Sequence, residues 1–439
     1  MRLKLSSLVG ILCLAVSCSD YANESIPAGS GPQPAMKPIT RPLPVEYANP
    51  NTGDFSVEKM LVNIGLNVIA KNVEDFYFNS GRLSTSINQY CDEIQNSAVG
   101  AQDFSLSENK VKSIWKETML SFHKVSMAGI GPLTDNNRAI YNKLYSWPVV
   151  SECGIDQEVI KNQGQAVSVP LADDVLANRR SLSAVEYLLF ESTLTSKCSA
   201  FVEPKAKEWS AKSLFEKKKD RCQYAKSVAQ DIQKNAEVIR NVWAPEKENY
   251  TVALIDKSIY SNVNKSVNAL TDALFAFEDF RDNDLAVPLG LHEDCKDASG
   301  KCLNYLEHPW SGIAAEAAIA QMQGFKEAFF GSRFENERAF GFDDYLVAKG
   351  HSIIAQSIQE NLASSIQGMK QLAQQDPTLR NTILNAKKEN CNIFESPKEA
   401  LDFVCQIYKD IQNVTATLKT DVMIILALEV PTGHAGDGD

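Results

Sequence analysis

Glu186 stands out because it is a carboxylate inside an apolar stretch, residues 180–190, that has helical spacing. Leu182 and Phe190 come one helical turn before it and one turn after it, so the three side chains share one helix face. Burying a charge without a partner costs a great deal of free energy. We therefore expect Glu186 either to bind a ligand or to be held by a neighbouring group.

Two neighbours could hold Glu186 without any ligand. Ser183 stands three residues before it, in the S-x-x-E spacing of a capping box at the start of a helix. Arg179 or Arg180 could instead form a charge-assisted pair with the carboxylate. Local capping or pairing is therefore the structural alternative to a binding role for Glu186, Ser183 and Arg180.

His292 and His308 are the candidate metal ligands outside this stretch. Both have acidic neighbours, and a disulfide between Cys295 and Cys302 would bring the ends of the intervening segment together. Imidazole and carboxylate groups suit divalent transition metals, although the spacing is not the His-Glu-x-x-His of zinc peptidases. We predict metal ligands among Glu186, His292 and His308, for iron or another divalent metal. The alternative is that these are ordinary solvated loop histidines.

Residues 1–17 have the pattern of a lipoprotein signal peptide. A short basic start is followed by an apolar core too short to cross a membrane in the mature protein, and small residues precede Cys18. This resembles the lipobox of bacterial lipoproteins, with lipidation of Cys18; a plain signal peptide is the alternative. Residues 18–54 are rich in proline and predict a tether. We expect a periplasm-facing protein anchored in the bacterial cell envelope, and Ser19 favours the outer membrane.

Eight cysteines follow Cys18, an even number that suits disulfides in an oxidising compartment. The chain has no C-x-x-C pair, which disfavours a zinc site. Connectivity cannot be deduced from spacing, so we predict pairing of nearest neighbours, with the last two pairs favoured by their short loops. The predicted disulfides are Cys91–Cys153, Cys198–Cys222, Cys295–Cys302 and Cys391–Cys405.

The chain after the tether predicts an all-α fold. Apolar residues recur at three- and four-residue spacing, as in Val111, Trp115 and Phe122, and no convincing run of alternating strand residues is present. The spacing predicts long continuous helices, among them 252–280 and 342–373. The long helices predict two helical-bundle domains, 55–245 and 246–439, which suggests a diverged duplication. His123 and His351 fall inside predicted helices and are interpreted as core-edge or surface residues. The net charge of −11, with scattered basic residues, argues against a nucleic-acid partner.

Several separate segments, in order along the chain, resemble the imelysin-like proteins, also classed as the M75 peptidase family. The resemblance covers roughly residues 55–439, and its strength lies in the ordered set rather than in any one segment. It implies two helical bundles, a location in the cell envelope and a part in bacterial iron acquisition. The segments are Trp115 with 131–133, 140–141, 146–148, 182–190, 288–291, 307–312 and 341–346.

The resemblance also implies a functional motif, G-x-H-x-x-E, for which metal binding and peptidase activity have been proposed. Glu186 takes the glutamate position, while Ser181 and Ser183 replace the glycine and the histidine. A serine hydroxyl is a poor substitute for an imidazole as a transition-metal ligand. Trp115, Trp147 and Trp310 lie in family-like segments and are predicted to line a pocket; the alternative is that they are core residues of the bundles.

Together these observations favour a non-enzymatic binding protein for iron or another metal. The site is predicted where the two halves meet, with Glu186, Ser183, Arg180, Trp115 and Trp147 as binding residues. The membrane, through the lipid anchor, and iron-uptake components are the predicted partners. A metal-dependent peptidase and a structural or docking lipoprotein are the alternatives.

Overall fold

Helices are the only regular elements among the residues that the structure describes. The computed structural model describes residues 40–97, 103–162, 171, 175–335, 337–374 and 378–428. The all-α prediction is therefore confirmed. The predicted signal peptide, Cys18 and the tether up to residue 39 lie outside the described residues. In the described part of the chain, no helix combines the length and the apolar character needed to cross a membrane.

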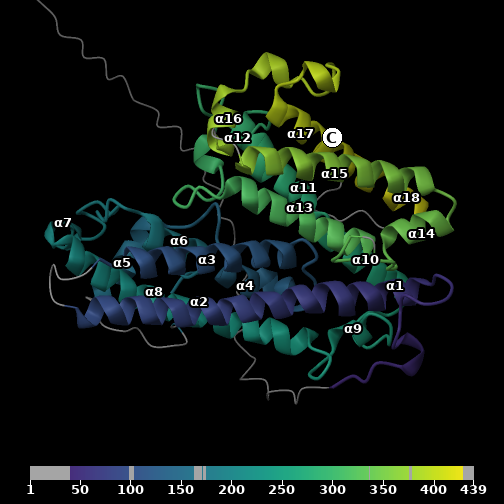
Figure 1. Ribbon diagram of the computed structural model, residues 1–439, viewed down its shortest axis with the longest axis horizontal. Coiled ribbons are helices and arrows are strands. Elements are labelled where there is room, and N and C mark those ends of the chain that lie inside the picture. The colour runs from purple at the N-terminus through teal and green to yellow at the C-terminus, as the bar shows by residue number, and fades with distance from the viewer. Residues whose placement is uncertain are drawn as a thin grey trace, which may run out of the picture. The chain divides into compact units, whose positions relative to one another are not determined.

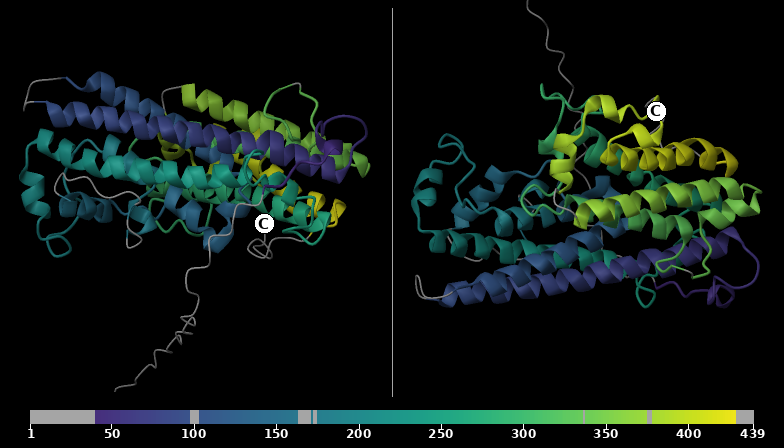
Figure 2. Two further views of the ribbon diagram at one scale, coloured as in Figure 1. Left: turned by 90° about the horizontal axis from the view of Figure 1, so that it is seen from below. Right: turned by 45° about the horizontal axis from the view of Figure 1, so that its top comes forward.

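Three long helices make up the first bundle. Helix α2 (Ala70–Asn96) packs against both α3 (Ser105–Ser126) and α8 (Leu214–Trp243), and Figures 1 and 2 show the three side by side. Their apolar positions recur every three or four residues and are buried at the shared faces. The other elements of this half are η1 (Val45–Tyr47), α1 (Val57–Asn63), η2 (Ile64–Ile69), η3 (Gly131–Leu133), α4 (Asp135–Leu144), α5 (Glu152–Asn162), η4 (Ala177–Arg179), α6 (Leu182–Phe190) and α7 (Ala206–Ala211).

The second bundle is built on α13 (Ala314–Phe330), α15 (Ser352–Gln374) and α17 (Phe403–Thr417), with α15 packed against the other two. The predicted boundary near residue 245 falls between α8 and α9, and the division into two domains stays a prediction. The other elements are α9 (Tyr250–Ala253), α10 (Val263–Leu274), α11 (Ala276–Phe280), η5 (Arg281–Ala286), α12 (Val287–Leu289), η6 (Leu303–Tyr305), α14 (Phe342–Ala348), α16 (Leu379–Asn385), η7 (Lys388–Cys391), η8 (Lys398–Ala400), η9 (Leu418–Val422) and α18 (Met423–Ile425).

Helices α3 and α13 join the two bundles, and a glycine lets them approach closely. A Cβ atom at Gly324 of α13 would lie 2.7 Å from the carbonyl oxygen of Lys124 and 2.8 Å from its Cα atom, both in the backbone of α3. These distances are shorter than van der Waals contact, so only glycine fits there without moving a helix. The close approach matters because His123 of α3 and Gln321 of α13 are within hydrogen-bond distance of each other nearby.

We expect Gly324→Ala to lower the free energy of unfolding by about 1–3 kcal/mol, because overpacking forces the two helices apart. The matched control is Gly81→Ala in α2, where the nearest heavy atom to an added Cβ is a side-chain atom of Gln233 at 3.5 Å. That change should stabilise the protein by up to about 1 kcal/mol, since alanine favours helix over glycine. Urea unfolding measures both; equal effects of the two substitutions would contradict the close-packing role of Gly324.

Two helices predicted as continuous are interrupted. The segment 342–373 is divided into α14 and α15, and Gly350 between them has φ of 87°. The segment 252–280 is divided among α9, α10 and α11, with Lys257 at φ 62°. Backbone in the left-handed region cannot continue a right-handed helix. The apolar spacing is similar on both sides of each break, so periodicity alone did not reveal it.

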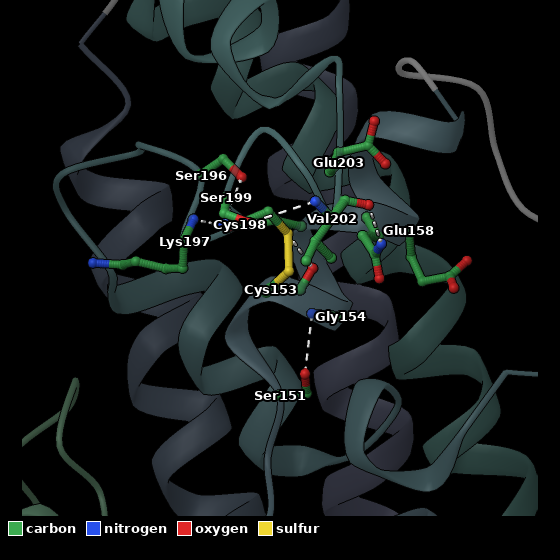
Figure 3. Close-up of a disulfide and its surroundings, with 12 residues drawn as sticks. Ser151, Cys153, Gly154, Glu158, Ser196, Lys197, Cys198, Ser199, Val202 and Glu203 are labelled. Carbon is green, nitrogen blue, oxygen red and sulfur yellow. Dashed lines mark hydrogen bonds between the residues drawn. A yellow bond between two sulfur atoms is a disulfide. The ribbon is translucent and has the colours of Figure 1, made fainter. Parts of the chain in front are cut away.

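Two predicted disulfides are confirmed and two are wrong. Cys295–Cys302 and Cys391–Cys405 form as predicted. The other four cysteines form Cys91–Cys222, which links the end of α2 to the start of α8, and Cys153–Cys198, which ties α5 to the loop after α6 (Figure 3). Packing of α2 against α8 brings residues 131 positions apart together, so nearest-neighbour pairing fails there.

The last part of the predicted tether contacts the helical body. Arg41 donates a hydrogen bond to the carbonyl of Glu248 at 3.3 Å, and its own carbonyl accepts one from Asn249 at 2.9 Å. The Asn51 side chain accepts from the backbone N–H of Phe340 at 2.9 Å. These hydrogen bonds tie parts of residues 40–54 to the body.

Candidate metal-binding site

The partners of Glu186 come from the second half of the chain. Glu186 lies on α6 with 1% of its surface exposed. One carboxylate oxygen accepts hydrogen bonds from the backbone N–H and the hydroxyl of Ser311, at 2.9 and 2.7 Å. The other oxygen lies 3.0 Å from Nδ1 of His308. The carboxylate is therefore buried and satisfied, as required, but by residues more than 120 positions away.

The predicted capping box of Ser183 and Glu186 is wrong. Helix α6 begins at Leu182, and the residue that caps it is Ser181, whose hydroxyl accepts from the backbone N–H of Ala184 at 3.3 Å. Ser181 has the extended backbone that an N-cap needs. Ser183 lies inside the first turn and is buried. Glu186 stands two residues beyond Ala184, the third helical position, from which a side chain reaches back to the cap.

Arg180 pairs with Asp231, whereas the sequence suggested a pair with Glu186. Its Nε and Nη2 atoms donate to the two oxygens of Asp231 at 3.0 and 2.6 Å, and both side chains are only 2% exposed. Arg179 pairs with Glu158 at 3.0 Å. A bidentate buried pair of this kind holds α6 and its entry loop on α8. Arg180 thus has a structural partner on α8.

A tight turn aims His308 and Ser311 at Glu186. His308 has φ of 58°, a conformation that costs energy for a residue with a side chain, and its carbonyl accepts from the N–H of Gly312 at 2.9 Å. Trp115 supports this arrangement from α3. Its indole N–H donates to the carbonyl of Leu182 at 2.9 Å, and its ring packs edge-on against the ring of His308 at 5.8 Å.

His123, Glu307 and His308 form a group of three that could hold a metal ion, and all three are buried. The Nε2 atoms of the two histidines are 3.1 Å apart, and Oε1 of Glu307 lies 3.5 Å from each of them. Ligand atoms bound to one metal at about 2.1 Å, with angles between about 90° and 109°, are about 3.0–3.4 Å apart. The three atoms therefore already have nearly the spacing of one face of a coordination sphere.

The other ends of the two imidazoles are also held. Nδ1 of His308 faces Glu186, and Nδ1 of His123 lies 3.1 Å from the side-chain nitrogen of Gln321 on α13. Gln321 also donates to Asp284 at 3.2 Å and to Glu307 at 3.3 Å. A carboxylate that accepts from Nδ1, as Glu186 does from His308, fixes the orientation of a metal-bound histidine and makes it a better ligand. Glu186 therefore has the position of a group that orients a ligand.

The electrostatics of the group place a proton on His308. Burial by itself lowers the pKa of His308, but the carboxylates of Glu307 and Glu186 outweigh it and raise that pKa to about 9. Burial, with the charge on His308, lowers the pKa of His123 well below its usual range. At neutral pH, His308 is therefore the protonated histidine of the pair and His123 is neutral. A metal ion would have to displace this proton, as is general for histidine ligands.

Glu307 is the carboxylate that favours a cation at this position. Burial raises its pKa above the usual range for a carboxyl group. Its Oε2 accepts from Gln321, while Oε1, the atom that faces both histidines, has no hydrogen-bond partner among the described residues. A buried carboxylate oxygen without a donor is costly. A metal ion between Glu307, His123 and His308 would remove that cost.

The structure brings together only part of the predicted metal set. His308 belongs to the group of three, and Glu186 contacts the Nδ1 atom of His308 without belonging to the group. His292 lies outside the group. The His292 side chain is 34% exposed, and its Nδ1 lies 3.5 Å from a carboxylate oxygen of its neighbour Asp294. The interpretation of His123 as a core-edge or surface residue is wrong, because His123 is buried and belongs to the group. The sequence signal for its burial is its place beside Phe122 among the apolar residues of the helix.

A cavity of about 720 Å³ adjoins the group, and His123 and Gln321 form part of its wall. Trp147, one of the predicted pocket residues, also lines it, in the segment between α4 and α5. Trp115 does not line it and is fully buried behind His308. Trp147 and Trp115 therefore have different positions, one in the wall of the cavity and one supporting the histidine.

Comparisons with known proteins add family and fold information. The model of the imelysin family, peptidase M75, matches residues 79–392. No match was found among curated proteins. Two solved structures share the fold: an imelysin-like protein from Psychrobacter arcticum 273-4, and a putative iron-regulated protein A precursor from Parabacteroides distasonis ATCC 8503. The first is 16% identical with a TM-score of 0.61, covering 86% of this chain and 98% of that one. The second is 14% identical with a TM-score of 0.57, covering 83% and 96%.

Proposed function

The chain belongs to the imelysin family, and from this membership we propose that it is a non-enzymatic binding protein for a divalent transition metal, in the first place iron. The observation that carries the proposal is the spacing of His123 Nε2, His308 Nε2 and Glu307 Oε1, at 3.1, 3.5 and 3.5 Å. Three ligands on one face leave the remaining coordination positions open, as in a site that exchanges its ligand.

Two histidines and one carboxylate are the ligand set typical of non-haem Fe(II). The set excludes soft ligands such as thiolates, because the eight cysteines after Cys18 are all in disulfides. Harder cations such as Ca²⁺ prefer six or more oxygen ligands, which this group does not supply. The printed name of the Parabacteroides distasonis relative, which calls that protein iron-regulated, agrees with iron as the first choice.

Glu186 orients His308 in this proposal and does not bind the metal. The serine at position 183 removes the histidine of the family motif, and His308 and His123 supply imidazoles from other parts of the fold. The motif glutamate keeps its place and accepts from Nδ1 of His308, so that Nε2 of the same ring points at His123 and Glu307. The carboxylate–histidine–metal arrangement is common in metal sites.

An anchor in the cell envelope is the second part of the proposal. It is supported by the signal-like pattern of residues 1–17 and by the small residues before Cys18. Several acyl chains on one cysteine would give stable attachment, whereas one chain would not. The four disulfides also suit an oxidising compartment such as the periplasm.

Calorimetric titration of the metal-stripped protein with Co²⁺, and with Fe²⁺ under anaerobic conditions, tests the proposal. We expect one ion per chain. Glu186→Gln should keep this stoichiometry and weaken the affinity about 10- to 100-fold, the usual effect of removing a group that orients a ligand. The reason is that an amide no longer accepts from Nδ1 of His308 as a carboxylate does.

Ser183→Ala is the matched control, because Ser183 is buried on the same helix but does not belong to the group of three. Its Co²⁺ affinity should equal that of the unmodified protein. Absence of stoichiometric metal binding in the unmodified protein would refute the proposed function. Loss of the bound ion altogether in Glu186→Gln, without unfolding, would make Glu186 a direct ligand instead.

A further inference from the structure

The cavity beside the metal group is far larger than a metal ion needs. Its volume of about 720 Å³ is in the range of pockets that hold small organic molecules, roughly 300–1,000 Å³. Its walls come from both halves of the chain, from α3 and α4 on one side and from α11, η5 and α13 on the other. Of the three proposed metal ligands, only His123 lines it. Most residues that line the cavity therefore have no part in the metal site.

The charged groups of the wall are mainly acidic. Asp279, Asp284 and Asp294 line the cavity, and Arg138 is the one lysine or arginine among the described lining residues. Asp284 accepts a hydrogen bond from Gln321 at 3.2 Å, and burial raises its pKa to about 7, so a nearby cation would favour its charged form. Arg138 is exposed, and its guanidinium lies over the ring of Tyr141 at 4.0 Å. A cavity lined by one sign of charge favours ligands of the opposite sign, so an organic anion is disfavoured here.

Aromatic rings make up much of the remaining wall. Tyr141, Tyr145, Trp147, Phe280 and Tyr305 all line the cavity. Tyr145 and Phe280 are buried, whereas Trp147 is half-buried and Tyr305 is 37% exposed. Aromatic faces attract cations through their quadrupole and also provide apolar area for the body of a ligand. Acidic groups and aromatic rings together are the usual recognition set for an organic ammonium or guanidinium group.

We propose that this cavity binds an organic cation, with its ammonium or guanidinium group near Asp284 and its apolar body against Trp147 and Tyr145. The proposal goes beyond the metal site and does not depend on it, because the groups that would recognise the cation are not metal ligands. A hydrated metal ion alone would use the acidic groups but would leave the aromatic rings without a role.

Three probes of the same shape and different charge test this proposal on the metal-stripped protein: 2-phenylethylammonium, 2-phenylethanol and phenylacetate. Ligand-observed NMR titrations give the Kd of each. We expect 2-phenylethylammonium to bind at least about tenfold more tightly than phenylacetate, with the neutral alcohol between them. Phenylacetate binding as tightly as the ammonium compound would overturn the proposal.

Substitutions in the wall locate the bound probe. Asp284→Asn should bring the affinities for the cation and the anion closer together, and Trp147→Ala should weaken all three probes. Phe201→Ala is the control, because Phe201 is 96% exposed and does not line the cavity. Unchanged binding in both Asp284→Asn and Trp147→Ala, with folding checked by circular dichroism, would refute this site.

The same variants separate this inference from the proposed metal function. Co²⁺ affinity should be unchanged in Trp147→Ala, since Trp147 does not belong to the metal group. If the unmodified protein bound 2-phenylethylammonium but no Co²⁺, the metal function would fail and the cavity inference would stand. If it bound Co²⁺ and showed no preference for the cationic probe, the cavity inference alone would fail.

Discussion

His308→Ala is expected to weaken Co²⁺ binding by at least about 100-fold. Metal sites with four protein ligands gain about 10–16 kcal/mol from the ion, or roughly 3 kcal/mol per ligand, and each 1.4 kcal/mol is a factor of ten in affinity. His308 provides Nε2 to the group and is the residue through which Glu186 acts. His308→Ala should therefore weaken Co²⁺ binding more than Glu186→Gln does. Calorimetry with Co²⁺, supported by the visible spectrum of the bound ion, measures it.

His292→Ala is the matched control for this prediction. His292 lies in the same half of the chain and also has an acidic neighbour, but its side chain is partly exposed and outside the group. We expect its Co²⁺ affinity to be unchanged. Equal losses in His292→Ala and His308→Ala would contradict the site, because they would indicate binding to scattered surface histidines.

The positions of most helices could be predicted from local sequence because apolar side chains must face the core every three or four residues. The spacing of Val111, Trp115 and Phe122, for example, predicted a helix, and all three are buried in α3. Breaks such as the one at Gly350 were missed because a short turn leaves apolar residues at helical spacing on both sides. Periodicity reports the buried face of an element better than its ends.

The site was only half predictable because its parts come from distant segments. Glu186 could be found, since an apolar helix with one carboxylate requires a partner for it. Its partner could not, because His308 is 122 residues away and the contact depends on how the two halves pack. The sequence near Glu186 indicates local partners such as Ser183 and Arg180 instead. In the folded chain, Arg180 pairs with Asp231, and Glu186 contacts His308.

His123 shows why a buried polar residue is easily misjudged from sequence. It lies on the same helix as Trp115 and Phe122, so its position alone indicates burial. What it contacts there depends on α13, which Gly324 allows to approach α3 within backbone contact. Only this approach places Gln321 next to its Nδ1, while the turn at His308 provides the partner of its Nε2. The sequence of α3 alone therefore indicates neither Gln321 nor His308 as a partner of His123.

Asp231→Ala is expected to lower the free energy of unfolding by about 3–5 kcal/mol, the usual cost of leaving a buried charge without its partner. Arg180 and Asp231 are each about 2% exposed and are joined by two hydrogen bonds, at 3.0 and 2.6 Å. Removing the carboxylate leaves the guanidinium in a buried position where water cannot replace it. Because Arg180 precedes the cap of α6, the loss should also loosen the helix that carries Glu186. Urea unfolding measures the change.

The exposed pair of Arg82 and Glu117 is the control for this prediction. Their side chains are 38% and 47% exposed, so Glu117→Ala should cost less than about 1 kcal/mol. A similarly small cost for Asp231→Ala would show that Arg180 does not need its partner for stability, and a ligand-binding role for Arg180 would return. A large cost, with Co²⁺ affinity retained below the unfolding transition, assigns Arg180 to the stability of the fold. That outcome leaves metal recognition to His123, Glu307 and His308.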